Sequence, residues 1–166
     1  GLNAVTLTTF LEGESREAGM FFASLAREIQ TNSRPFSAPC VILAAGETTT
    51  KISDNAEIRG HGGPSHELVA AFALAASKVP GACMLSIDTE GTDGTTLYAG
   101  GLTDSKTAEA ARLAGIDLYE ALRGHAVGEA LVALNDAVFT GNTGTNLCDL
   151  NVLYVPAAAS DRFKKS

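Results

Sequence analysis

The chain has 166 residues, of which 45% are hydrophobic, and these values suit one globular domain with a substantial core. The formal net charge of -7 argues against a nucleic-acid partner, because phosphate neutralisation needs a basic surface. No apolar run reaches the roughly 18 residues of a membrane helix, and the N-terminus lacks the pattern of a signal peptide. We therefore expect a cytoplasmic protein without membrane contact.

The first part of the chain predicts a strand, a helix and two more strands. A strand is expected at 4–10 from weak alternation, and a helix at 15–30 from the helical spacing of apolar residues. A short apolar run at 40–45 and a β-branched stretch at 48–53 indicate the two further strands. The remainder predicts a long helix that begins at Pro64, further short helices, and three strands. The helices are expected at 64–79 and 103–115, followed by two short helices up to residue 135. The strands are expected at 83–88, 137–141 and 149–155.

Because strands and helices alternate, we expect an α/β fold, a three-layer α/β/α arrangement with a mixed, mostly parallel sheet. The neighbouring strands at 40–45 and 48–53 favour a mixed sheet over a purely parallel one. No domain boundary is visible after about residue 35, so we expect units at 1–35 and 36–158, with a tail at 159–166.

The cysteines and the first residue carry two further expectations. Cys40, Cys83 and Cys148 are far apart and odd in number, which predicts reduced core thiols. The sequence begins with Gly1 instead of Met, so we expect a processed or excised piece of a longer protein.

Three glycine-rich loops follow or precede predicted strands, at 59–67, 88–96 and 141–146. Ligands in open α/β sheets bind beyond the strand ends, where such loops gather. The first loop runs into a helix, whose free backbone N–H groups can hold an anion. Each loop alone is also explained as a tight turn, but three small, polar loops together favour a site.

The acidic stretch IDTEGTDGTT (87–96) raises the question of a metal. Its spacing rejects an EF-hand, whereas Mg²⁺ held by one or two carboxylates and substrate phosphates stays open. His61, His66 and His125 complete no zinc pattern, so we expect no metal site within this chain alone. Glu47 follows a buried strand and either points into the same cleft or ends a turn.

Five motifs, in order, resemble the C-terminal, or MOFRL, domain of the glycerate 2-kinases, some of whose relatives are called hydroxypyruvate reductases. They are LEGESREAG, AAGETTT, GHGGPSHELVAAFALA, IDTEGTDGTTLYAGG and TGNTGTNLCDLNVL, and the resemblance covers residues 4–155. It implies ATP-dependent, Mg²⁺-assisted phosphoryl transfer to the 2-hydroxyl of D-glycerate. Reduction of hydroxypyruvate has little support, because the chain has no dinucleotide fingerprint.

The resemblance also implies partners. We expect the nucleotide-binding N-terminal domain of the family to lie outside the given sequence, and residues 1–35 to be a remnant of it or a link to it. We expect this chain to be inactive alone, to meet that domain as a missing part or separate subunit, and to bind a glycerate-like small molecule. Apolar residues on the 15–30 helix make a homo-oligomer a further expectation.

The matched motifs imply two sets of site residues. The catalytic candidates are Glu90 and Asp93. The substrate- and phosphate-binding candidates are Glu47, Gly62, Gly63, Ser65, His66, Glu67, Thr143, Gly144, Thr145, Asn146 and Asp149.

This chain departs from the family pattern at charged positions. Pro64 stands where the family has Arg, Glu90 where it has Asp, and Leu97 where it has Asp. Phosphoryl transfer depends on cations and on positioning, so the loss of the Arg at Pro64 and the longer carboxylate side chain at Glu90 both bear on activity. The alternative is therefore a stand-alone, non-catalytic module that keeps the fold and binds a small anion.

Overall fold

The computed structural model describes residues 2–52 and 57–158. Its strands are β1 (Asn3–Leu11), β2 (Cys40–Gly46), β3 (Cys83–Asp88), β4 (Gly100–Asp104), β5 (Ala137–Val138) and β6 (Asp149–Val155). Its helices are α1 (Ser15–Asn32), α2 (Pro64–Ala75), α3 (Thr107–Leu113), α4 (Leu118–Arg123) and α5 (Val127–Leu134), with a 3₁₀ turn at Ala76–Lys78.

The strands form one mixed sheet in the order β1-β2-β6-β3-β4-β5, which confirms the α/β class. The expectation of mostly parallel pairing is wrong. Only β1 and β2 are parallel, whereas the β2–β6, β6–β3, β3–β4 and β4–β5 pairs are all antiparallel. The cause is that β6, the last strand, runs back between β2 and β3, and that a loop instead of a helix joins β3 to β4.

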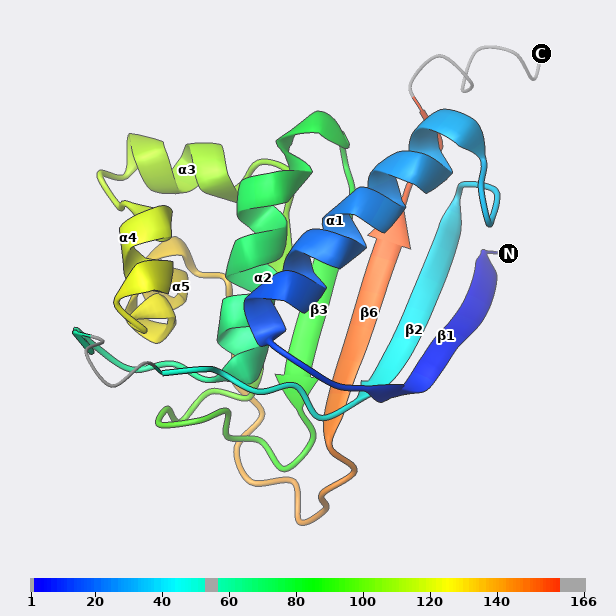
Figure 1. Cartoon of the computed structure of the whole chain (residues 1–166). Coiled ribbons are helices and arrows are strands. Elements are labelled where there is room, and N and C mark those ends of the chain that lie inside the picture. Colours follow the sequence, from blue (N-terminus) through cyan, green and yellow to red (C-terminus); the bar gives the residue numbers. More distant parts are fainter. Residues whose placement is uncertain (1, 53–56, 159–166) are drawn as a thin grey trace.

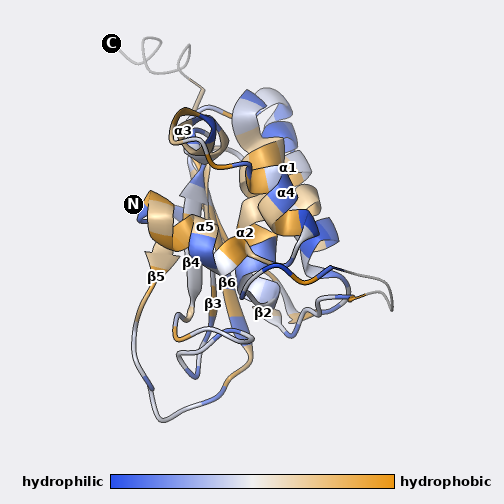
Figure 2. Ribbon diagram, turned by 90° about the vertical axis from the view of Figure 1, so that its left-hand side faces the viewer, coloured by the Kyte–Doolittle hydropathy of each residue, from blue (hydrophilic) through white to orange (hydrophobic). Residues whose placement is uncertain are grey.

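The helices cover one face of the sheet, so the structure has two layers and not the three expected (Figure 2). Burial alternates along the central strands: in β6, Asn151, Leu153 and Val155 are buried, whereas Leu150, Val152 and Tyr154 are half-exposed. The same alternation holds in β2 and β3. Within the described residues, the core therefore lies between the sheet and the pair α1 and α2.

Several element boundaries differ from the prediction. Residues 48–52 form no strand, because Thr49 makes only an isolated bridge to Glu14; residue 53 lies outside the described ranges. The helix predicted at 64–79 ends at Ala75 and continues as a 3₁₀ turn. The range 103–115 holds the end of β4 followed by the shorter helix α3. Two glycines at 100 and 101 concealed β4, since glycine is depleted in strands.

The cysteines are free thiols in different environments. Cys40 is buried in β2 and Cys83 is half-buried, as expected for core residues, but Cys148 is exposed in the loop before β6. Among the described residues, no helix has both the length and the hydropathy that a membrane crossing needs.

Gly19 sets how closely α1 and α2 approach. A Cβ at this position would lie 2.2 Å from the carbonyl oxygen of Leu68 in α2. The same Cβ would also lie 3.0 Å from the Cβ of Ala71 and from the backbone N of Phe72. The two long helices therefore pack backbone to backbone, which positions the N-terminus of α2.

Replacing Gly19 with alanine is expected to lower the free energy of unfolding by about 2 kcal/mol, because the added methyl group forces the helices apart. Urea denaturation followed by circular dichroism measures the change. Ser24→Ala on the exposed side of the same helix is the control and should change stability by less than about 0.5 kcal/mol. Equal stability of the two variants would show that the helices are not in close contact.

Candidate functional site

The predicted glycine-rich loops gather at one end of the sheet, below β3 and β6 in Figure 1. Antiparallel pairing causes this, because β6 begins where β2 and β3 end. Asp149, the first residue of β6, lies opposite both Gly46 and Asp88. Carboxylates from loops that are distant in the sequence are therefore brought together.

Asp93 closes the N-terminus of α2. Its Oδ1 accepts a hydrogen bond from the backbone N–H of Ser65 (3.2 Å), and its Oδ2 accepts one from the N–H of His66 (2.9 Å). Oδ2 also contacts Nδ1 of the His66 ring. Negative charge is favourable at a helix N-terminus, where N–H groups lack partners within the helix. The anion that holds this terminus is thus a side chain of the protein itself.

Glycine is required where the two loops meet at this terminus. A Cβ on Gly63 would lie 2.5 Å from the Asp93 carboxylate, and one on Gly94 would lie 2.2 Å from the carbonyl oxygen of Gly62. Gly94 also has φ +58, in the left-handed region that glycine tolerates best. The glycines of both motifs therefore serve the contact between the loops.

Glu67 links two cationic or hydrogen-bonding partners inside the protein. The carboxylate is 1% exposed; Arg16 of α1 donates to Oε2 at 2.8 Å, and Nδ1 of His125 lies 2.6 Å from Oε1. A buried carboxylate needs such partners, because burial without them is costly. This arrangement, Arg16–Glu67–His125, joins α1, α2 and the segment after α4.

Asp149 is a second buried carboxylate in the same region. It accepts hydrogen bonds from the backbone N–H (3.2 Å) and the hydroxyl (3.4 Å) of Thr48. Burial and, to a smaller extent, the charges of Asp93 and Asp88 raise the pKa of the Asp149 carboxyl to about 6, in spite of the lowering effect of the Thr48 bonds. Protonation of this group therefore falls near neutral pH.

The helix face of the sheet carries polar side chains beneath α2. Ser86 of β3 donates to the hydroxyl of Ser65 at 3.0 Å. Nε2 of His66 and both side-chain polar atoms of Asn151 are buried without a hydrogen-bond partner among the described residues. His66 has no exposed surface, so its predicted contact with a ligand stays a prediction.

The exposed rim consists of Glu90, in the first half of the acidic loop, and the loop before β6. Oε2 of Glu90 accepts a hydrogen bond from Nδ2 of Asn146 (3.0 Å), and Thr143 donates its backbone N–H to the carbonyl of Glu90. Gly144 and Thr145 lie beside them and are exposed, and Glu47 is exposed as well. The structure thus joins Glu90 to the 141–146 loop, apart from the buried Asp93.

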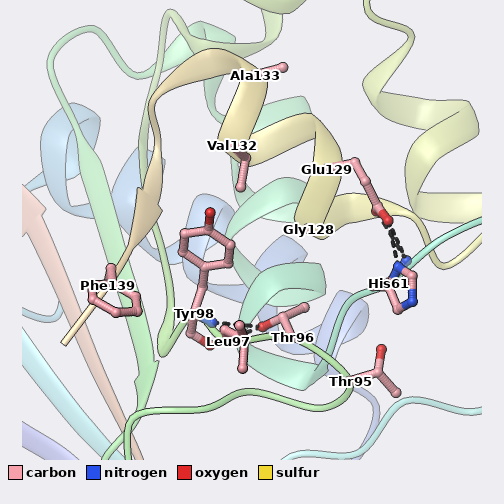
Figure 3. A pocket seen from close by; sticks show the side chains of 10 residues that line it. All are labelled: His61, Thr95, Thr96, Leu97, Tyr98, Gly128, Glu129, Val132, Ala133 and Phe139. Atoms are coloured by element: carbon pink, nitrogen blue, oxygen red, sulfur yellow. Dashed lines mark hydrogen bonds and ion pairs between the residues drawn. The ribbon is translucent and has the colours of Figure 1, made fainter. Parts of the chain in front are cut away.

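Two hollows share His61 and Thr95 in their lining, and the first of them adjoins the N-terminus of α2. The first has a volume of about 430 Å³ and is bordered by Glu67, His125, His61, Thr95 and the glycines between them. The second, of about 730 Å³, is shown in Figure 3 and is mainly apolar. Tyr98 and Phe139 pack edge to face in it, and His61 contacts Glu129 through Nδ1 at 2.7 Å.

Sequence reasoning found part of this arrangement. The matched motifs gave Gly63, Ser65, His66, Glu67 and Asp93, which the structure brings together. Arg16 and His125 were missed, because they are 51 and 58 residues from Glu67 and no local spacing connects them. The one sequence signal for them was indirect: a glutamate buried within a helix needs hydrogen-bonding or cationic partners, and these must come from elsewhere in the chain.

The same region is where a metal ion would be expected to bind. Within residues 2–52 and 57–158, no group of three or more His, Cys, Asp or Glu side chains is placed to hold a metal ion. Among these residues, no Lys or Arg borders the 430 Å³ hollow. The described side chains therefore form no metal site of three or more ligands, and none that lines the hollow supplies a Lys or Arg to the phosphates of ATP.

Comparison with known proteins places this geometry in a family. The sequence profile of the MOFRL family matches residues 40–149. A glycerate 2-kinase of Pyrococcus horikoshii is 39% identical over 93% of this chain and 34% of its own length. A D-glycerate 2-kinase of Thermotoga maritima is 38% identical over 90% of this chain and 35% of its own length.

The fold is shared as well as the sequence. The crystal structure of a glycerate kinase from Thermotoga maritima superposes with a TM-score of 0.87 at 37% identity, and the match covers 93% of this chain and 36% of that chain. The chain thus spans about a third of the length of the relatives it matches.

Substituting Asp93 with asparagine is expected to lower the free energy of unfolding by about 2 kcal/mol, since a charged acceptor of three donors is lost and an amide N–H₂ faces backbone N–H groups. Chemical denaturation measures the loss. Glu90→Gln on the exposed rim is the matched control, with an expected change below about 0.5 kcal/mol. If Asp93→Asn were as stable as this control, the carboxylate would not be holding α2.

The raised pKa of Asp149 predicts a pH dependence of stability. The pKa in the folded state is about 6, above the unfolded value of about 3.9, so the folded state holds more protons between these values. The contribution of Asp149 to the unfolding free energy therefore falls as pH rises from 4 to 6, by on the order of 1 kcal/mol after allowance for solvent screening.

Asp149→Asn isolates this contribution, since asparagine still accepts the Thr48 bonds but does not titrate. The unfolding free energies of the two proteins are measured by urea denaturation at pH 4 and pH 7. Relative to the parent, Asp149→Asn should be more stable at pH 7 than at pH 4. A difference that is constant with pH would contradict the raised pKa.

Proposed function

The chain belongs to the MOFRL family, and from this premise we propose that it is the C-terminal domain of a glycerate 2-kinase-like enzyme. The reaction is transfer of the terminal phosphoryl group of ATP to D-glycerate. In this proposal the chain supplies contacts to the substrate and to the phosphoryl group, and it is inactive alone.

One observation carries the proposal. Two relatives named as kinases that act on glycerate match at least 90% of this chain at 38–39% identity. The family match over residues 40–149 includes the loops that form the 430 Å³ hollow and the N-terminus of α2, and a glycerate kinase structure has the same fold. A likeness confined to the core would support the fold alone.

Charge supports a division of labour between two domains. Phosphoryl transfer relies on cations around the phosphates. Arg16 pairs with Glu67, which lines the hollow, and Arg59, whose sequence neighbours Ile58 and Gly60 line it, pairs with Glu57 and Glu120. We therefore propose that ATP and Mg²⁺ are bound by a separate nucleotide-binding domain, with residues 1–35 as the link to it. The nucleotide would then meet the hollow from outside.

The predicted site residues divide into two groups under this proposal. The exposed rim residues Glu90, Thr143, Thr145 and Asn146 contact the substrate or the phosphoryl group. The buried residues, with Asp93 as their centre, hold the loops in place instead of touching a ligand. A cytoplasmic location, and contact of the exposed Met20 and Phe21 with another domain or a second copy, belong to the same proposal.

A second candidate is a stand-alone module that binds a small anion without catalysis. The observation that favours it is Pro64, which borders the hollow at the position where the family has arginine. Stabilisation of the chain against heat by D-glycerate or phosphate, without turnover when a nucleotide-binding domain is supplied, would favour this candidate.

The proposal predicts that ATP-dependent phosphorylation of D-glycerate requires both domains. ADP release in a coupled assay, with the product identified by ³¹P NMR, should be undetectable for this chain alone. It should appear when the chain is joined to the nucleotide-binding domain of its own protein. The same two-domain protein carrying Asp93→Asn should lose activity in proportion to its loss of folded protein. Absence of turnover and of glycerate binding in every form would refute the proposal.

A further inference from the structure

His125 is a buried histidine just beyond the C-terminus of a helix. It is the second residue after the helix α4, is only 8% exposed, and borders the 430 Å³ hollow. Its backbone has φ 53, in the left-handed region that non-glycine residues rarely adopt. The sequence motifs assign it no role.

The two nitrogens of the His125 ring have different surroundings. Nδ1 lies 2.6 Å from the Glu67 carboxylate, which is buried and also bound by Arg16. An ionised carboxylate only accepts hydrogen bonds, so Nδ1 carries a proton and, in the neutral ring, Nε2 has the free lone pair. The arrangement Arg16–Glu67–His125 therefore fixes both the tautomer and the orientation of the imidazole.

Nε2 of His125 is open to a ligand, in contrast to Nε2 of His66. The His66 atom is sealed inside the protein without a partner. Nε2 of His125 is not among these sealed atoms, and no described side chain bonds to it. A neutral imidazole nitrogen in such a hollow accepts hydrogen bonds, which suits a hydroxyl group better than a carboxylate or a phosphate.

The other candidates for a proton acceptor are less suitable. Asp93 is 1% exposed, and its oxygens are occupied by Ser65 and His66. Glu90 is exposed and bonded to Asn146, and no described residue excludes water from it. His61 also has a carboxylate partner, Glu129, but its side chain is 68% exposed.

We infer that His125 accepts the proton of the substrate hydroxyl in the hollow, with Glu67 as its positioning residue. This inference rests on the proposed function. As the hydroxyl O–H bond breaks, its proton goes to Nε2 and its oxygen forms a bond to the terminal phosphorus of the nucleoside triphosphate. The bond between that phosphorus and the bridging oxygen breaks, and the nucleoside diphosphate leaves with the electron pair. The imidazolium then returns its proton to water.

The kinetic test uses His125→Gly in the two-domain protein, because glycine tolerates the backbone conformation and leaves space for an added base. The kcat is expected to fall by about 10²- to 10⁴-fold, with a KM for D-glycerate within a few-fold of the parent. Added imidazole should restore part of the kcat. A kcat equal to the parent, or a loss that imidazole does not restore, would overturn the inference.

A second test is independent of turnover and uses this chain alone. ¹⁵N NMR of the histidine rings should show His125 protonated at Nδ1. D-glycerate and D-lactate, which both carry a 2-hydroxyl, should shift its Nε2 resonance, whereas 3-hydroxypropionate, which lacks that group, should not. No shift with any of the three, or equal shifts with all three, would overturn the inference.

The two failures are distinguishable. If the parent two-domain protein turns over no D-glycerate, the proposed function fails before any variant is made, and the inference fails with it. If the parent is active and His125→Gly is equally active, the function stands and the inference alone is wrong.

Discussion

The contact between Asp93 and the N-terminus of α2 is the interaction on which the rest of the site depends. A single carboxylate accepts from two backbone N–H groups and contacts the ring of His66. It thereby ties the loop after β3 to the loop before α2, and the glycines at 63 and 94 permit the close approach. Without it, the first turn of α2 would present unpaired donors, and both hollows would lose a common wall.

This contact changes how the glycine-rich loop before α2 is interpreted. A glycine loop leading into a helix commonly indicates a site for an external phosphate. Here the chain's own anion fills that position, and Asp88 and Asp149 add further negative charge nearby. An incoming phosphate would be repelled unless cations accompanied it. The local electrostatics therefore favour a neutral group, such as a hydroxyl, on this side of the cleft.

The sequence was most informative where one segment carries the whole signal. The strand at 83–88 and the start of α2 at Pro64 were predicted because apolar runs and a proline at the first helical position are local features. The motifs also brought together Glu67 and Asp93. The antiparallel position of β6 was not predictable, because strand order depends on contacts between distant segments. His125 was missed for the same reason, since its partner is 58 residues away.

Burial decided between the two roles that the sequence left open for the acidic residues. Asp93 and Glu90 are three residues apart in one loop, yet one is 1% exposed and the other is on the surface. The periodicity of a loop does not report which side chain turns inward. Asp93 turns inward because its carboxylate accepts hydrogen bonds from Ser65 and His66, and these two residues lie on another element, α2.

The most direct test of this account is a crystal structure of the two-domain protein with D-glycerate bound. The account predicts that the 2-hydroxyl oxygen lies about 3 Å from Nε2 of His125 and that Asp93 still accepts from the N–H groups of Ser65 and His66. A carboxylate or phosphate of the ligand bound to those two N–H groups, with Asp93 displaced, would contradict it.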